Sequence, residues 1–145
     1  MTTQLDITTI ENLRNLNSQT KSKYFAGSRI TQDISKRKWY EKMSNIRSGF
    51  MLDLQEVTEI DALQPSEEMQ LAQTSLEEIR EKLPKNNKEE KETLLQQELI
   101  QQEEEVEKAY QELKKSVSSE NDELFNVLNL HEDKIHGYIE KLKSF

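Results

Sequence analysis

Residues 95–117 read LQQELIQQEEEVEKAYQELKKSV, and this stretch decides the fold class. Its apolar residues recur three or four positions apart, and Gln102 or Glu103 fills the one step without an apolar residue. Most other positions are glutamate, glutamine or lysine. A narrow apolar stripe on a polar body is typical of a coiled-coil strand or a solvated bundle helix. The stripe, which we call a seam, consists of Leu95, Leu99, Val106, Tyr110, Leu113 and Val117.

The same rhythm extends on both sides of this stretch. A second seam lies between Pro65 and Pro84 and consists of Met69, Ala72, Leu76, Ile79 and Leu83. A third seam consists of Leu124, Leu128, Ile135, Tyr138, Leu142 and Phe145. Residues 84–87 have the length of a helical hairpin turn, and Asn87 with Glu90 has the spacing of a capping box.

The connection between the first and third seams has two interpretations. The phase of the stripe is nearly kept across 117–124, which favours one continuous helix from 88 to 144. A break at 118–122, with Ser119 capping a final helix, is the other possibility. Phe125 and Leu130 lie partly off the stripe, which favours a second contact surface near the C-terminus.

The first 64 residues predict one short helix and one long helix. Apolar residues three apart from Ile7 to Leu16 predict a short helix near 8–17, and residues 17–20 and 26–28 have the composition of turns or linkers. A second stripe predicts a long helix near 32–63, which begins at Thr31 or Gln32 and stops before Pro65. Gly49 lies inside this helix and predicts a bend. The residues of the second stripe are Trp39, Met43, Ile46, Phe50, Leu54 and Val57.

Composition agrees with an all-α protein of little apolar content. Of the 145 residues only 33% are apolar, where globular domains carry roughly 45–50%. Three glycines and two prolines are too few for a turn-rich β fold. We therefore predict an all-α, elongated helical hairpin or open bundle with coiled-coil segments, whose stripes the chain alone need not cover. Its segments are 1–30 (short helix and linker), 31–64 (basic-to-acidic helix) and 65–145 (acidic coiled-coil helices).

The net charge of −8 divides into opposed blocks, because residues 1–20 carry −1, residues 21–48 carry +6 and residues 49–145 carry −13. The basic block predicts a docking patch with four interpretations. It is a binding site for an acidic partner helix, a phosphate-binding surface for nucleic acid or phosphoinositide, a nuclear-import signal, or a helix whose tryptophan is a core anchor and whose lysines are solvated. The patch consists of Lys36, Arg37, Lys38, Trp39, Tyr40, Lys42 and Arg47.

The sequence contains no motif that predicts catalysis, a metal or a cofactor. His131 and His136 are five residues apart, which places them roughly 140° apart around a helix and predicts two surface histidines. There is no cysteine, and three scattered glycines cannot form a phosphate-binding loop. We predict a protein without enzymatic activity.

The sequence also contains no apolar run of the roughly 18 residues that a membrane span needs, and no signal-peptide h-region. We therefore expect an intracellular protein without transmembrane insertion, in either nucleus or cytoplasm.

These observations favour a non-catalytic structural or adaptor subunit. Its seams would assemble with partner helices in a homo- or hetero-oligomer by knobs-into-holes packing, and its charged flanks would select the partner. One alternative is a nucleic-acid-associated regulator that uses residues 21–47 on phosphates. Another is a peripheral membrane tether that uses the basic helix.

Overall fold

Five α-helices account for the regular structure of the described part of the chain. The computed structural model describes residues 4–58, 65–85, 87–117 and 122–145. The helices are α1 (Gln4–Ile30), α2 (Ile34–Thr58), α3 (Pro65–Lys82), α4 (Lys88–Ser116) and α5 (Asp122–Lys143). The predicted all-α class is confirmed.

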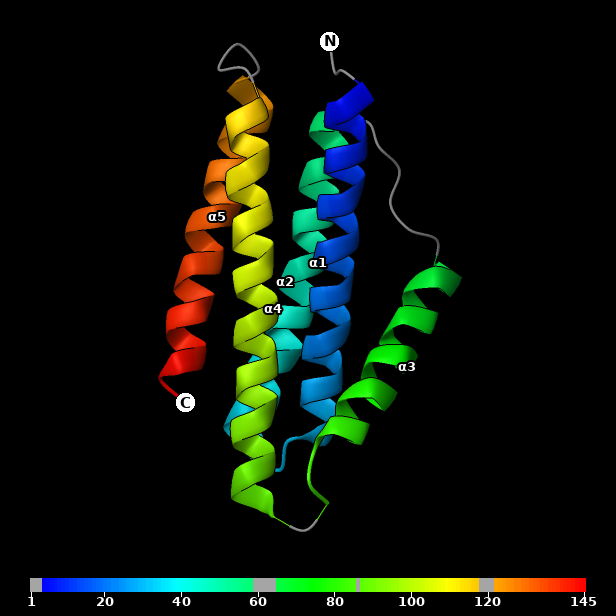
Figure 1. Cartoon of the computed structure of the whole chain (residues 1–145), viewed down its shortest axis with the longest axis vertical. Helices are drawn as coiled ribbons and strands as arrows, with labels where there is room; N and C mark the ends of the chain where they lie inside the picture. The colour runs from blue at the N-terminus through cyan, green and yellow to red at the C-terminus, as the bar shows by residue number, and fades with distance from the viewer. Residues whose placement is uncertain (1–3, 59–64, 86, 118–121) are drawn as a thin grey trace.

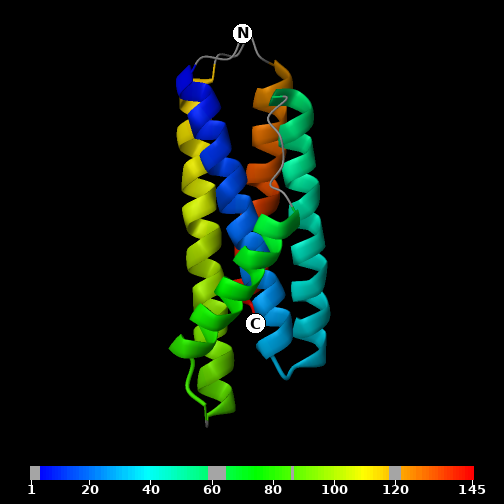
Figure 2. The same ribbon diagram turned by 90° about the vertical axis from the view of Figure 1, so that its right-hand side faces the viewer.

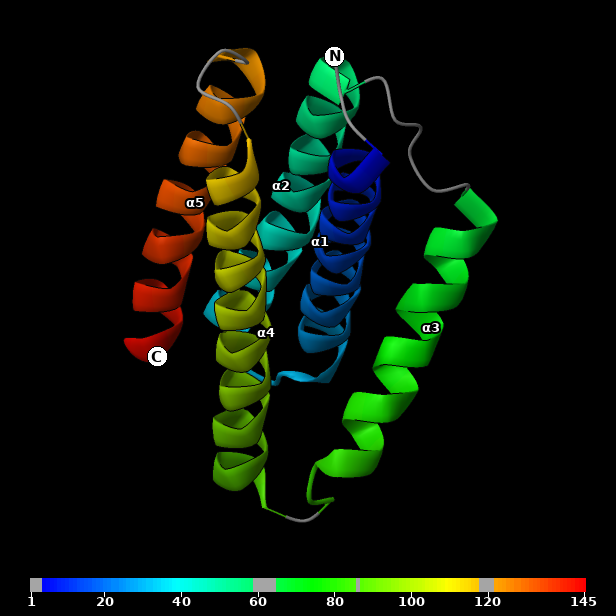
Figure 3. The ribbon, with the colours of Figure 1, turned by 45° about the horizontal axis from the view of Figure 1, so that its top comes forward.

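Helices α1, α2, α4 and α5 form a four-helix bundle (Figure 1). Around the bundle α1 contacts α2, α2 contacts α5, α5 contacts α4, and α4 contacts α1. Each of these neighbours runs antiparallel to the next, so α2 and α4 lie diagonally opposite and run in the same direction (Figure 3). Two parallel helices cannot be joined by a short turn. Helix α3 makes the return crossing, packed obliquely on the outer side of α1 (Figure 2).

Helix α1 corrects the prediction of a short helix followed by linkers. It continues without a break through residues 17–20 and 26–28, which the sequence assigned to turns. Hydroxyl groups there donate to carbonyls of the preceding turn, from Thr20 to Leu16 at 2.8 Å and from Ser22 to Ser18 at 3.0 Å. Burial of this segment between α2, α3 and α4 outweighs its turn-like composition.

The helix ends follow cap chemistry. The Asp33 carboxylate accepts the Lys36 backbone N–H at 3.0 Å and caps α2, which therefore begins at Ile34 and not at Thr31 or Gln32 as predicted. The Asn87 side chain accepts the Glu90 N–H at 3.0 Å and caps α4 as predicted. Helix α4 ends at Ser116 because Val117 is extended, so the alternative of one helix from 88 to 144 is wrong. Ser119 and the predicted end of α2 near 63 lie outside the described residues.

The seams fill the interior of this chain. Two clusters of buried residues lie along the bundle, one centred on Phe50, Tyr110 and Leu128 and the other on Tyr24, Tyr40 and Leu99. The chain thereby covers most of the stripes that the sequence left open to a partner. Buried seam residues are Ile79, Leu83, Leu95, Leu99, Val106, Tyr110, Leu113, Leu124, Leu128, Ile135 and Leu142. Half-buried ones are Ala72, Leu76, Val117, Tyr138 and Phe145, and Met69 is exposed.

The three glycines allow a test of this packing. A Cβ at Gly27 would lie 3.2 Å from Cδ2 of Tyr40, a buried ring that would have to shift by a few tenths of an ångström, whereas Gly49 and Gly137 have nothing within 4 Å. We expect Gly49→Ala and Gly137→Ala to raise the free energy of unfolding by up to about 1 kcal/mol each, because alanine favours the helix. Gly27→Ala should lower it. Urea denaturation of the three variants checks this, and a stabilised Gly27→Ala would contradict the packing of α1 on α2.

Candidate functional site

A fully buried ion pair lies at the centre of the bundle. Arg47 on α2 and Glu103 on α4 are both inaccessible to solvent, and two guanidinium nitrogens donate to the two carboxylate oxygens at 2.6 and 2.5 Å. Tyr24 on α1 donates its hydroxyl to the same carboxylate at 2.7 Å. Burial alone lowers the pKa of Arg47, but the Glu103 carboxylate outweighs it and raises that pKa. Arg47 therefore stays protonated inside the protein.

Hydrogen bonds continue from this pair to the surface. Arg47 Nε donates to the side-chain carbonyl oxygen of Asn17 at 2.8 Å. The side-chain amide nitrogen of Asn17 donates to the Tyr110 hydroxyl at 3.0 Å. Tyr110 is 2.7 Å from His131 Nδ1, and His131 Nε2 is 2.9 Å from the Asp53 carboxylate. Each polar side chain of this network thus meets the next one, and all four bundle helices contribute.

One proton assignment satisfies every bond of this network. Because the Tyr110 oxygen accepts from Asn17, its own proton goes to His131 Nδ1. His131 is then neutral, with its proton on Nε2 and donated to Asp53. A second proton on His131 would leave the Tyr110 hydroxyl without its acceptor. The network therefore favours the neutral imidazole.

His131 corrects the expectation of two surface histidines. Its ring is 0% exposed and stacks on Phe50 with ring centroids 4.0 Å apart, and Arg47 lies over Phe50 at 4.9 Å. Burial lowers the pKa of His131, and the nearby Arg47 and Lys134 charges add to the effect, while Asp53 opposes it. His136 is exposed, as expected, and lies 3.3 Å from a Glu107 oxygen.

The network is closed, apart from Asp53, whose side chain is 47% exposed. Burial raises the pKa of both Tyr24 and Tyr110, so these phenols act as neutral donors. The cavities beside Arg80, Leu71, Leu94 and Phe25 lie elsewhere on the surface, and no network residue lines them. In the described ranges no three histidine, aspartate or glutamate side chains are grouped to hold a metal. The arrangement joins the four bundle helices to one another.

The predicted basic patch is split by the fold. Tyr40 and Arg47 are buried, so they are not part of a surface patch. Trp39 is half-buried and makes edge contacts with Tyr24, Tyr40 and Phe145. The remaining cations surround this cluster or face solvent: Lys36 over the Phe145 ring, Arg37 bonded to the Thr31 carbonyl, and exposed Lys38 and Lys42. The core-anchor interpretation describes Trp39 best.

A groove of about 260 Å³ lies between α1, α2 and α3, and the most exposed of its lining side chains are apolar. Phe25 of α1 is 39% exposed and Met69 of α3 is 72% exposed there. Met69 is the uncovered first member of the α3 seam. The remaining lining residues are Ser18, Lys21, Ser22, Ser44 and Ala72.

No protein-family model, curated protein or solved structure matches this chain. No helix of the described residues is long and apolar enough to cross a membrane. The function is therefore inferred from the geometry of the interior network and of the surface cavities.

Sequence reasoning missed the network, although two signals for it exist. Arg47 lies in step with Met43, Phe50 and Leu54, at spacings of four, three and four. Gln102 and Glu103 fill the step of the α4 seam that lacks an apolar residue, and both are buried, with Gln102 donating to Thr20 at 3.0 Å. A charged residue at a core position on each of two helices is the pattern that predicts a buried pair.

The buried pair predicts a strong coupling between its two residues. Arg47→Met should lower the free energy of unfolding by roughly 3–5 kcal/mol, because it leaves the Glu103 charge buried without a partner. Lys82→Met, which removes the exposed partner of Glu98, should change it by less than about 1 kcal/mol. The double variant Arg47→Met/Glu103→Gln should be more stable than Arg47→Met alone. Chemical denaturation and a double-mutant cycle measure these changes, and additive effects would contradict the pairing.

The neutral buried histidine predicts a pH dependence. In the unfolded chain His131 titrates near its ordinary 6.5, and in the folded protein its pKa is lower. The unfolded state therefore binds more protons as the pH falls below 6.5, and stability decreases down to the folded-state pKa. Besides Asp53 and Arg47 of α2, the groups facing the ring are Tyr110 of α4 and Lys134 of α5.

We expect His131→Gln to remove this stability slope between about pH 5.5 and 7, since glutamine does not titrate. His136→Gln is the matched control and should keep the slope. Urea unfolding midpoints across this pH range are the measurement. An unchanged slope in His131→Gln would show that the histidine is not held neutral.

Proposed function

We propose that this chain is a non-catalytic adaptor, a helical bundle that binds a protein partner in a homo- or hetero-oligomeric complex. The observation that carries the proposal is the uncovered end of the α3 seam. The apolar stripe of α3 packs inside the molecule at Ile79 and Leu83 but ends outward at Met69. There it meets Phe25 across the groove between α1, α2 and α3.

The groove has the chemistry of a protein-binding surface. Aromatic side chains and methionine are enriched at the centres of interfaces, and methionine adapts to the shape of its partner. The small side chains Ser18, Ser22, Ser44 and Ala72 line the space beside them and leave room for an inserted side chain. An amphipathic partner helix that lies along α3 would place an apolar residue in this groove.

The interior supports a binding role in preference to a chemical one. A catalytic acid or base needs access to a substrate, and the titratable groups of the buried network bind one another instead. Because this network joins all four bundle helices, it favours one arrangement of the residues on their surface. This is what an adaptor requires of its scaffold.

Met69→Glu tests the proposal. Partner binding should weaken by at least about tenfold, because a carboxylate would replace an apolar anchor in the interface. The partner is first identified with a photo-crosslinking residue at position 69, and its affinity for the wild type and the variant is then measured by calorimetry with the purified protein. Light scattering of the chain alone shows whether the partner is a second copy.

Leu52→Glu is the matched control, since it makes the same kind of change at a residue of α2 that is 56% exposed and does not line the groove. It should leave the affinity unchanged. Equal crosslinking from positions 69 and 52, or equal affinity of Met69→Glu and the wild type, would reject the groove as the binding surface. Thermal melting confirms that both variants are folded.

A further inference from the structure

A second cavity, of about 320 Å³, lies at the end of the bundle where α3 turns into α4. Its apolar lining comes from Ile30 at the end of α1 and from Leu83 and Pro84 after α3. The four other lining residues are all cationic: Arg29, Arg80, Lys85 and Lys91. They come from α1, α3, the α3–α4 connection and α4, so the fold brings together charges that are far apart in sequence.

Within the described part of the chain, these cations have no carboxylate partner, since none of the four forms an ion pair or hydrogen bond to a carboxylate there. Lysines elsewhere on the same helices are paired, as Lys23 and Lys82 are with Glu98. The neighbouring Glu92 carboxylate is already engaged by the Thr31 hydroxyl at 2.8 Å and by the Gln32 N–H at 3.0 Å. A basic pocket without counter-charges is unexpected in a chain of net charge −8.

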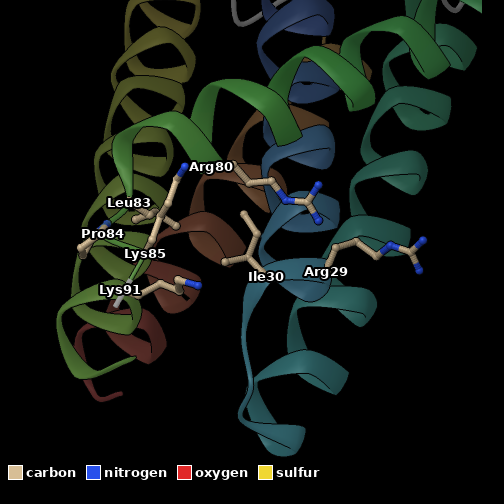
Figure 4. Close-up of a pocket in the computed structure, with 7 residues that line it drawn as sticks. All are labelled: Arg29, Ile30, Arg80, Leu83, Pro84, Lys85 and Lys91. Carbon is tan, nitrogen blue, oxygen red and sulfur yellow. The ribbon is translucent and has the colours of Figure 1, made fainter. Parts of the chain in front are cut away.

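Helix dipoles explain the positions of only two of the four cations. Arg29 and Arg80 lie in the last turns of α1 and α3, where a cation is favoured by the partial negative charge of the helix end. Lys85 follows α3 outside the helix, and Lys91 lies near the N-terminal end of α4, where the dipole disfavours a cation. In Figure 4 the Lys91 side chain extends toward Ile30, and the Arg29 guanidinium points away from the other three cations. The placement of Lys85 and Lys91 therefore does not follow from the helix dipoles.

We propose that this pocket binds a small phosphorylated ligand. Arginine and lysine donate charge-assisted hydrogen bonds to phosphate oxygens, and Arg80, Lys85 and Lys91 supply donors from three elements around one cavity. The volume lies at the lower end of the range for small-molecule sites, about 300–1,000 Å³. Ile30, Leu83 and Pro84 give the non-phosphate part of a ligand an apolar surface. The site is separate from the groove at Phe25 and Met69, so the two binding activities can be lost independently.

Calorimetric titration of the full chain with sodium tripolyphosphate at low salt is the first test. We expect saturable binding that weakens as salt is added, because screening reduces the attraction between exposed charges. The double variant Arg80→Gln/Lys91→Gln should bind at least about tenfold more weakly. The control Lys108→Gln/Lys115→Gln removes two charges from the far half of α4 and should bind like the wild type.

Two further experiments test whether the phosphate belongs to a lipid headgroup or to a soluble molecule, and whether the pocket prefers an acidic peptide. Co-sedimentation with vesicles that contain a phosphoinositide, competed by tripolyphosphate, shows whether the same pocket accepts a lipid headgroup. Binding of phosphoinositide vesicles that requires Arg80 and Lys91 supports the site with a lipid source, and binding of tripolyphosphate alone supports it with a soluble source. A polyglutamate peptide that binds more tightly than tripolyphosphate would overturn the proposal in favour of an acidic protein segment.

The absence of tripolyphosphate binding at low salt would also overturn it, as would equal losses in the two double variants. The four substituted residues are exposed or half-buried surface side chains, so the variants should fold. Thermal melting of each variant confirms this before binding is compared.

Discussion

The ion pair between Arg47 and Glu103 is the constraint on which the bundle depends. Two buried charges are tolerated only where each has its partner and its remaining hydrogen bonds. A shift of α2 by one turn along the bundle would leave both charges buried and unpaired. The pair therefore selects one register. Through Tyr24 and Asn17 it includes α1, and through Tyr110 and His131 it includes α5.

This arrangement explains how a chain with so few apolar residues forms a bundle. The interior positions that lack an apolar residue hold hydrogen-bonded side chains, among them Asn17, Thr20, Gln102 and Glu103. Each makes a bond to a neighbouring helix, as Gln102 does to Thr20 and Asn17 does to Tyr110. Satisfied polar contacts add specificity while apolar contacts supply the driving force for burial. The low apolar content thus reflects an interior that contains hydrogen-bonded polar side chains, and it does not indicate an incomplete core.

Periodicity predicted where the later helices lie, because an apolar stripe of period 3.6 that persists over about twenty residues is the pattern of an amphipathic helix. It failed at residues 17–28, where serine, threonine, asparagine and glycine fit a turn as well as a buried helix, and only packing on three neighbours decides. It also failed at Arg47 and His131. Spacing assigns a residue to a face of its helix but does not identify what that face contacts. The hydrogen-bonded carboxylate lies 56 residues away in sequence for Arg47 and 78 residues away for His131.

The crossover helix α3 links the topology to both surface sites. Because α2 and α4 run in the same direction, the chain must return along the outside of the bundle, and α1 is the helix it packs on. A helix that packs on one outer face leaves its two ends incompletely covered. At one end the seam is exposed at Met69 and forms the groove; at the other, Arg80 and Leu83 meet Lys91 across the turn into α4 and form the basic pocket. The connection that the parallel pair α2 and α4 requires therefore forms both the groove and the basic pocket that we propose as binding sites.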